Sequence, residues 1–223
     1  MMKKLTSIIL SIIIFNFFAC YYLFASENYG DAMRWYEQEN TNLSPRQIYI
    51  LALNAEQKDL KAKSIYYYRE AAKQDLVAAK IRLGIILSSS MHKKHQIEAR
   101  KWLLEVVREK NINVILTLAW MYEFGIGGNL NLYEAQKLYK LAAKLGSYES
   151  FLSLANLSLR GIHGEPKFIE AMSYTILASR MSVPGSSQLF DQILPLIQTN
   201  QWDEIEISIA SLQSEINKIH INQ

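Results

Sequence analysis

A pattern of small and bulky apolar residues repeats along the chain at a nearly fixed interval. Ala135 is followed at helical spacing by Leu138, Tyr139 and the pair Ala142-Ala143. Related patterns start at Ala32, Ser64, Ala99 and Ala171. The offsets between successive starts are 32, 35, 36 and 36 residues. Periods of this size are typical of solenoids built from helix pairs.

A second set of positions repeats in register with the first. It consists of Leu-Ala or Leu-Gly pairs that begin at Leu51, Leu83, Leu118 and Leu154. Gly125 and Gly161 lie seven residues after the last two leucines. Small residues let two helices approach closely, and glycine ends a helix because it adopts the left-handed conformation easily. The pattern therefore predicts helix hairpins, which must stack because one hairpin cannot bury its own apolar face.

The stretch "AQKLYKLAAKLGSYESFLSLANLSLRGIHG" (135–164) resembles the SEL-one-like repeat, a tetratricopeptide-type helix pair. The resemblance covers about residues 32–182 and is strongest over 99–164. It implies an all-α, right-handed superhelical solenoid of four to five hairpins over residues 26–182, acting as a protein-binding scaffold. Asn131 stands where many members carry aspartate, and residues 88–96 lack the glycine loop. Cysteine-rich members have been linked to β-lactam binding, but this chain lacks those cysteines, so that activity is not implied.

Residues 183–223 are expected to form capping helices. The stretch "SVPGSS" (182–187) breaks the array, and a short helix follows that is interrupted near Pro195. Asn200, with Asp203 three residues later, predicts the start of a last helix. Its apolar residues fall on one stripe: Trp202, Ile205, Ile209, Leu212, Ile216 and Ile219. A terminal amphipathic helix covers the last exposed face of a solenoid.

The N-terminus differs from the rest of the chain. Lys3 and Lys4 precede an apolar run over residues 5–24, which is typical of an export segment. Residues 1–25 are interpreted as a signal peptide cleaved after Ala25, as an uncleaved membrane anchor, or as a segment lipidated on Cys20. In each case the remainder faces away from the cytoplasm, because the lysines stay inside. We therefore expect a periplasmic or secreted protein, or one anchored by residues 5–24.

Charge and composition narrow the chemistry. Without Lys3 and Lys4 the basic residues fall from 24 to 22, against 21 acidic ones. A nearly neutral body gives no reason to expect a nucleic-acid partner. Cys20 is the single cysteine, so the remainder has no disulfide and no thiolate metal site.

The candidate motifs favour a non-catalytic protein. The glycines of "EFGIGGNL" (123–130) lack the Lys-Ser/Thr of a phosphate loop, so they predict a helix end and a turn. His92 and His95 flank two lysines in an expected polar loop without a third ligand, so no metal is expected. No G-x-S-x-G motif occurs. We expect no catalytic residue, no cofactor and no enzyme activity.

The predicted binding surface follows from the repeated leucines. In helix-pair solenoids the first helix of each pair lines the inner, concave face. Residues two before and two after each leucine share a face that is not the hairpin seam, and seven of the eight are apolar or aromatic. They are Tyr49, Leu53, Ile81, Ile85, Leu116, Trp120, Leu152 and Asn156. An exposed apolar strip marks a binding surface, unless the helix over 201–219 fills it.

Together these observations predict an exported, non-catalytic scaffold that binds a protein or peptide on the concave face of a helical repeat array. Two alternatives remain at this point. One is a ligand-binding or hydrolytic protein of the cell envelope. The other is an assembly factor tethered to the membrane by an intact N-terminal helix.

Overall fold

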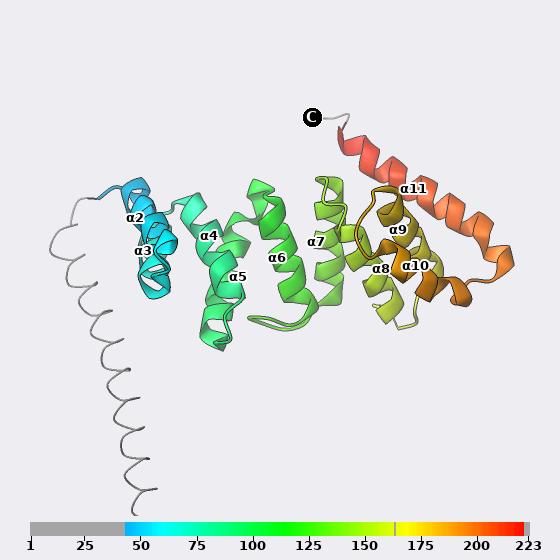
Figure 1. The fold of residues 1–223 in the computed structure, drawn as a ribbon, viewed down its shortest axis with the longest axis horizontal. Coiled ribbons are helices and arrows are strands. Elements are labelled where there is room, and N and C mark those ends of the chain that lie inside the picture. The colour runs from blue at the N-terminus through cyan, green and yellow to red at the C-terminus, as the bar shows by residue number, and fades with distance from the viewer. Residues whose placement is uncertain (1–42, 163, 221–223) are drawn as a thin grey trace, which may run out of the picture. The chain divides into compact units, whose positions relative to one another are not determined.

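The computed structural model describes residues 43–162 and 164–220, with side chains up to residue 216. All regular elements in this part of the chain are helices (Figure 1). The chain divides into two compact units, residues 1–80 and 81–223. The predicted export segment and the repeat that starts at Ala32 lie outside the described residues. None of the described helices combines the length and the apolar run needed to cross a bilayer.

The described part of the first unit is one helix hairpin. It consists of α2 (Pro45–Gln57) and α3 (Lys61–Lys73), followed by the start of α4 (Val77–Ser88). The side chains of Ser44 and Gln47 form a capping box that fixes the beginning of α2. Ala52 and Ala71 are fully buried, as the small-residue pattern predicts.

The second unit repeats the hairpin along the chain (Figure 1). Its helices are α4 with α5 (Lys93–Val106), α6 (Ile112–Glu123) with α7 (Leu132–Lys144), and α8 (Ser150–Arg160) with α9 (Phe168–Arg180), plus the 3-10 turn η1 (Val107–Glu109). The small and leucine positions of both helices are buried in every pair. They are Leu83, Ala99, Leu118, Ala119, Ala135, Leu154, Ala155 and Ala171. The predicted succession of hairpins is confirmed.

The loops inside two of these hairpins share one hydrogen-bond pattern. The amide of Asn131 donates to the carbonyl of Tyr122 at 2.8 Å, and the amide of Lys167 donates to the carbonyl of Ser158 at 2.9 Å. Both pairs occupy equivalent repeat positions. Gly161 ends α8 with a φ of 68°, which confirms the predicted helix end. The side chain of Asn131 accepts from the amide of Glu134 at 3.1 Å, so this loop position is a helix cap.

The segment around the two histidines differs from the prediction of a polar loop. Helix α5 begins at Lys93, so His95 lies in its first turn and only His92 precedes it. The Nδ1 atom of His95 lies 2.9 Å from Oγ of Ser90. The prediction was wrong for His95 because the lysine and histidine side chains tolerate a helix start, and no glycine prolongs the connection.

The chain ends in α10 (Ser186–Ile193), the 3-10 turns η2 (Leu194–Leu196) and η3 (Thr199–Gln201), and α11 (Trp202–His220). The predicted helix start at Asn200 is wrong. Gln198 and Gln201 form the capping box instead, with the amide of Gln198 donating to Oε1 of Gln201 at 2.8 Å.

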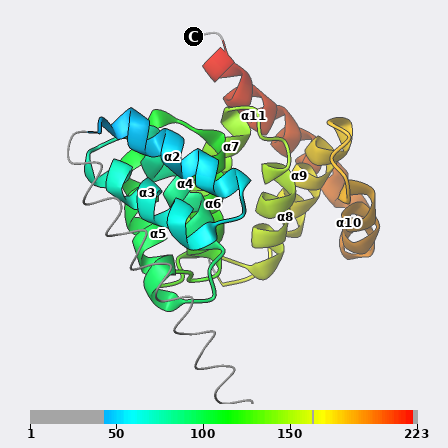
Figure 2. The same cartoon turned by 60° about the vertical axis from the view of Figure 1, so that its left-hand side comes forward.

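Helix α11 does cover the end of the array. It packs on α9 and α7 (Figure 2). Ile205 and Ile209 of the predicted stripe are buried in the core, while Trp202, Leu212 and Ile216 pack against it partly buried. The side chain of Ile219 lies outside the described residues.

A close approach of two helices in the second unit generates a test. A Cβ added to Gly84 on α4 would lie 2.6 Å from Cγ and Cδ2 of Leu103 on α5. We expect Gly84→Ala to lower the free energy of unfolding by about 1 kcal/mol, because overpacking exceeds the gain in helix propensity. In a Leu103→Ala background the same change should instead stabilise by about 0.5–1 kcal/mol. Denaturant melts of the four variants measure both signs; equal effects in the two backgrounds would contradict the close-packing argument.

Candidate functional site

The eight predicted surface residues lie on the first helices of the four described hairpins. None of them is fully buried. Tyr49 and Leu53 lie on α2 in the first unit, and the ring of Tyr49 lies 5.5 Å from that of Tyr68. In the second unit the pairs lie on α4, α6 and α8, and are Ile81 with Ile85, Leu116 with Trp120, and Leu152 with Asn156.

The most exposed aromatic group of this set is on α6. Trp120 keeps 39% of its surface exposed, and Phe124, one turn later, keeps 56%. Their ring centroids lie 6.1 Å apart at a tilted angle. The guanidinium of Arg160, from α8, lies 6.0 Å from the ring centroid of Phe124. Trp120, Phe124 and Arg160 therefore form one aromatic and cationic group, which we call the α6 aromatic group.

Phe124 and Arg160 were missed by the sequence analysis. Phe124 follows Trp120 by four residues and so shares its face of the helix, which is a signal that the sequence contained. Arg160 stands four residues after Asn156 in the same way. Both residues stand six positions after a repeated leucine, outside the two flanking positions from which the surface was predicted.

The surface around the α6 aromatic group rests on the core. Leu116 and Leu152 pack partly buried against the main hydrophobic cluster. The sequence left open that the last helix, α11, fills this surface. The packing of α11 bears on that alternative. Helix α11 packs mainly on α9 and α7, which are second helices, and its Leu212 and Ile216 line a small void together with Leu154 of α8. Trp120 and Phe124 on α6 remain open to solvent.

Beneath the α6 aromatic group lies a buried carboxylate. The side chain of Glu123 accepts a hydrogen bond from the hydroxyl of Tyr139 at 2.8 Å and one from Arg160 at 2.8 Å. Its side chain is 10% exposed. Burial raises the pKa of Tyr139 above its ordinary value, and the charge of Glu123 raises it further, so this phenol remains a donor. Through these bonds the end of α6 is tied to both α7 and α8.

The same pairing occurs in the first unit. The hydroxyl of Tyr68 on α3 donates to Glu56 on α2 at 2.5 Å. Glu56 and Glu123 both stand five residues after a repeated leucine. At the equivalent positions of the hairpin α4–α5 the residues are Ser88 and Leu103, so carboxylate and phenol are absent together. The pair therefore joins the two helices in two of the four described hairpins, α2–α3 and α6–α7.

The glycine-rich loop after α6 has a structural partner. The guanidinium of Arg100 lies 3.8 Å over the ring of Tyr122 and donates to the carbonyl of Asn129 at 3.2 Å. A Cβ on Gly127 would lie 2.2 Å from the carbonyl oxygen of Gln96. The segment is a helix end followed by a turn, as predicted, and its glycines permit a close approach to α5 that was not predicted.

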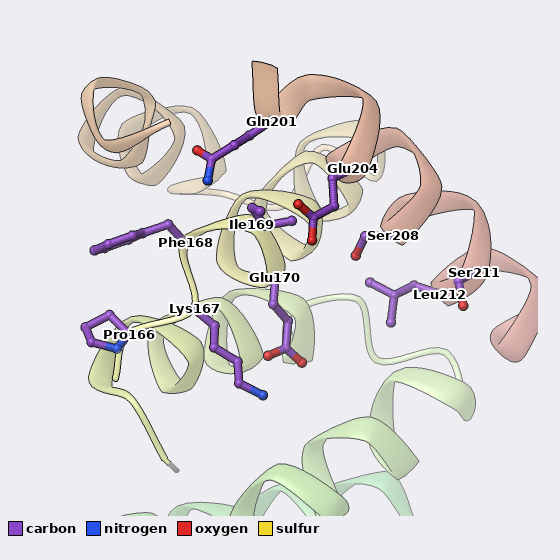
Figure 3. Close-up of a pocket in the computed structure, with 10 residues that line it drawn as sticks. All are labelled: Pro166, Lys167, Phe168, Ile169, Glu170, Gln201, Glu204, Ser208, Ser211 and Leu212. Atoms are coloured by element: carbon purple, nitrogen blue, oxygen red, sulfur yellow. The ribbon is translucent and has the colours of Figure 1, made fainter. Parts of the chain in front are cut away.

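A wider cavity of about 560 Å³ lies between the start of α9 and α11 (Figure 3). Lys167 and Glu170 project from the α9 side, and Glu204 and Ser208 project from α11. These charges are mixed and do not converge on one point. Among the described residues no group of three or more His, Cys, Asp or Glu side chains could hold a metal ion.

The fold is similar to two solved structures of SEL-one-like repeat (SLR, Sel1) proteins. One is a protective antigen present in uropathogenic Escherichia coli strains, with a TM-score of 0.62 and 17% identity over 80% of this chain and 40% of that chain. The other is a Sel1 repeat protein from Oxalobacter formigenes, with a TM-score of 0.53 and 15% identity over 77% of this chain and 72% of that chain. This chain thus matches less than half of the Escherichia coli protein. No family model and no curated protein matches the sequence.

The joint at Glu123 generates a prediction. Glu123→Gln keeps the shape but weakens two bonds made to a charge, so we expect the free energy of unfolding to fall by about 1–3 kcal/mol. The matched control is Glu206→Gln, at an exposed acidic residue of α11, which should change it by less than about 0.5 kcal/mol. Urea melts followed by circular dichroism give both values. Equal, small effects would show that Glu123 does not join the repeats.

Proposed function

We propose that this chain, which has the SEL-one-like repeat fold, is an exported, non-catalytic scaffold that binds a protein or peptide partner on the first-helix face of its hairpins. One observation carries the proposal. Trp120 and Phe124 expose 39% and 56% of their surfaces side by side on a helix whose other face is buried. Large aromatic side chains on rigid supports are the usual anchors of protein interfaces.

The chemistry of the described residues supports a binding role over a catalytic one. Two buried charged groups of the second unit are used in joining helices: Glu123 is engaged by Tyr139 and Arg160, and Arg100 by Tyr122 and Asn129. An active site needs polar groups that converge on a substrate. The cavity between α9 and α11 brings together charges of both signs without such convergence.

The proposed anchor can be tested with a matched pair of variants. The protein is purified from the cells that make it, and what it retains is identified by mass spectrometry. We expect the partner to be retained by the original chain and by Ile207→Ala, which removes an apolar residue that is 71% exposed on α11. Trp120→Ala should weaken the isolated partner's binding by more than about 1 kcal/mol in a titration, because it removes an aromatic anchor.

The melting temperature separates the outcomes of this test. Trp120→Ala should leave it nearly unchanged if Trp120 serves a partner. If Trp120→Ala unfolds the protein, Trp120 is a core residue and the proposed surface is wrong. If the partner binds both variants equally, it uses another surface.

Export is proposed from Lys3, Lys4 and the apolar run over residues 5–24. A reporter enzyme that works only outside the cytoplasm, fused to the C-terminus, should be active. Lys3→Glu combined with Lys4→Glu should reduce that activity. Cys20→Ala should leave the mass of the protein unchanged apart from the substitution, and the loss of a lipid-sized mass would show that Cys20 is lipidated. A reporter active only in the cytoplasm would contradict export.

A further inference from the structure

A lysine-lined recess lies between α7 and the C-terminal half of α11. Its volume is about 440 Å³. Lys137, Lys140 and Lys144 line it at three- and four-residue spacing along α7, so their side chains share one side of that helix. The apolar side chains of Tyr133 and Leu141 line it as well. The recess belongs to second helices and is separate from the α6 aromatic group.

A small void of about 20 Å³ borders the recess and shares Lys140 and Lys144 with it. Tyr174 of α9 lines this void and is 1% exposed. The hydroxyl of Tyr174 has no hydrogen-bond partner among the described residues. A buried hydroxyl without a partner is costly and calls for an explanation. Burial, and then the charges of Glu170 and Glu215, raise the pKa of Tyr174, so its hydroxyl remains a donor.

The groups around the recess are matched to a carboxylate. Lys144 forms an ion pair with Glu215 of α11, so one carboxylate of the chain already occupies part of this site. The ammonium group of Lys137 lies 3.9 Å from the carboxylate of Glu134. Within the described part of the chain, no ion pair involves Lys140, which lines both the recess and the inner void.

We propose that this recess binds a carboxylate side chain of an acidic peptide segment. The ammonium group of Lys140 and the hydroxyl of Tyr174 hold the carboxylate, while Tyr133 and Leu141 contact the apolar residues beside it. Charge-assisted hydrogen bonds of this kind are the strong ones. Glu215 acts as an internal competitor, because it holds Lys144.

The test uses fluorescence anisotropy with fluorescein-labelled hexaglutamate, hexaglutamine and an oligothymidylate. The protein should bind hexaglutamate and leave hexaglutamine free. Lys140→Met and Tyr174→Phe should each weaken hexaglutamate binding by about tenfold, as expected for one bond to a charged group. Lys94→Met, which removes an exposed lysine of α5, should change it by less than about twofold. Glu215→Gln should strengthen binding about threefold by releasing Lys144.

Each outcome decides the proposal. Tyr174→Phe also reports on a purely structural role: if it raises the melting temperature and leaves binding unchanged, the hydroxyl does not contact a ligand and the site is wrong. Absence of hexaglutamate binding, equal weakening by Lys94→Met, or tighter binding of oligothymidylate through Lys140 would each overturn it. Trp120→Ala should leave hexaglutamate binding unaltered, so failure here and failure of the α6 aromatic group are distinguishable.

Discussion

Close packing between helices at small residues is the constraint on which the second unit depends. An amphipathic helix of 11 to 14 residues, the length of the paired helices here, is marginal in water by itself, and its stability comes from burying one face. Ala119, Ala135, Ala155 and Ala171 are fully buried. At Gly84 even one added carbon would meet Leu103. The spacing of these small residues therefore fixes which face of each helix packs inward and which face stays exposed.

Polar joints add specificity to this packing without forming a site of their own. Glu123 receives Tyr139 from the next helix and Arg160 from the one after it, so its charge is compensated inside the fold. A buried carboxylate without such partners would destabilise the protein strongly. Where the repeat has Ser88 in place of the glutamate it also has Leu103 in place of the tyrosine. The hairpin α4–α5 therefore lacks this joint, and its helices approach closely at Gly84.

The two proposed binding surfaces consist of residues that the packing of the helices leaves exposed. The first helices leave Trp120 and Phe124 exposed beside Arg160. Helices α7 and α11 leave a recess lined by lysines, and Tyr174 lines a small void beside it. The two surfaces differ in chemistry, one aromatic and one basic, and they lie on different sets of helices. In the proposed scaffold the two surfaces would hold two different segments of partner, because neither surface uses the residues of the other.

The sequence by itself determined the hairpins, the buried alanine and leucine positions, the turn at Gly161 and the apolar stripe of α11, because these depend on helical periodicity and on local glycine and cap chemistry. It misplaced the start of α5 and the cap at Gln198, since several polar residues near a helix start can cap it and the context selects one. Only the tertiary structure decided that Phe124 and Arg160 join Trp120, that Glu123 is buried, and that Tyr174 lines a void beside a lysine-lined recess. Those facts depend on which side chains of different helices meet, and a repeat pattern along one chain does not specify that.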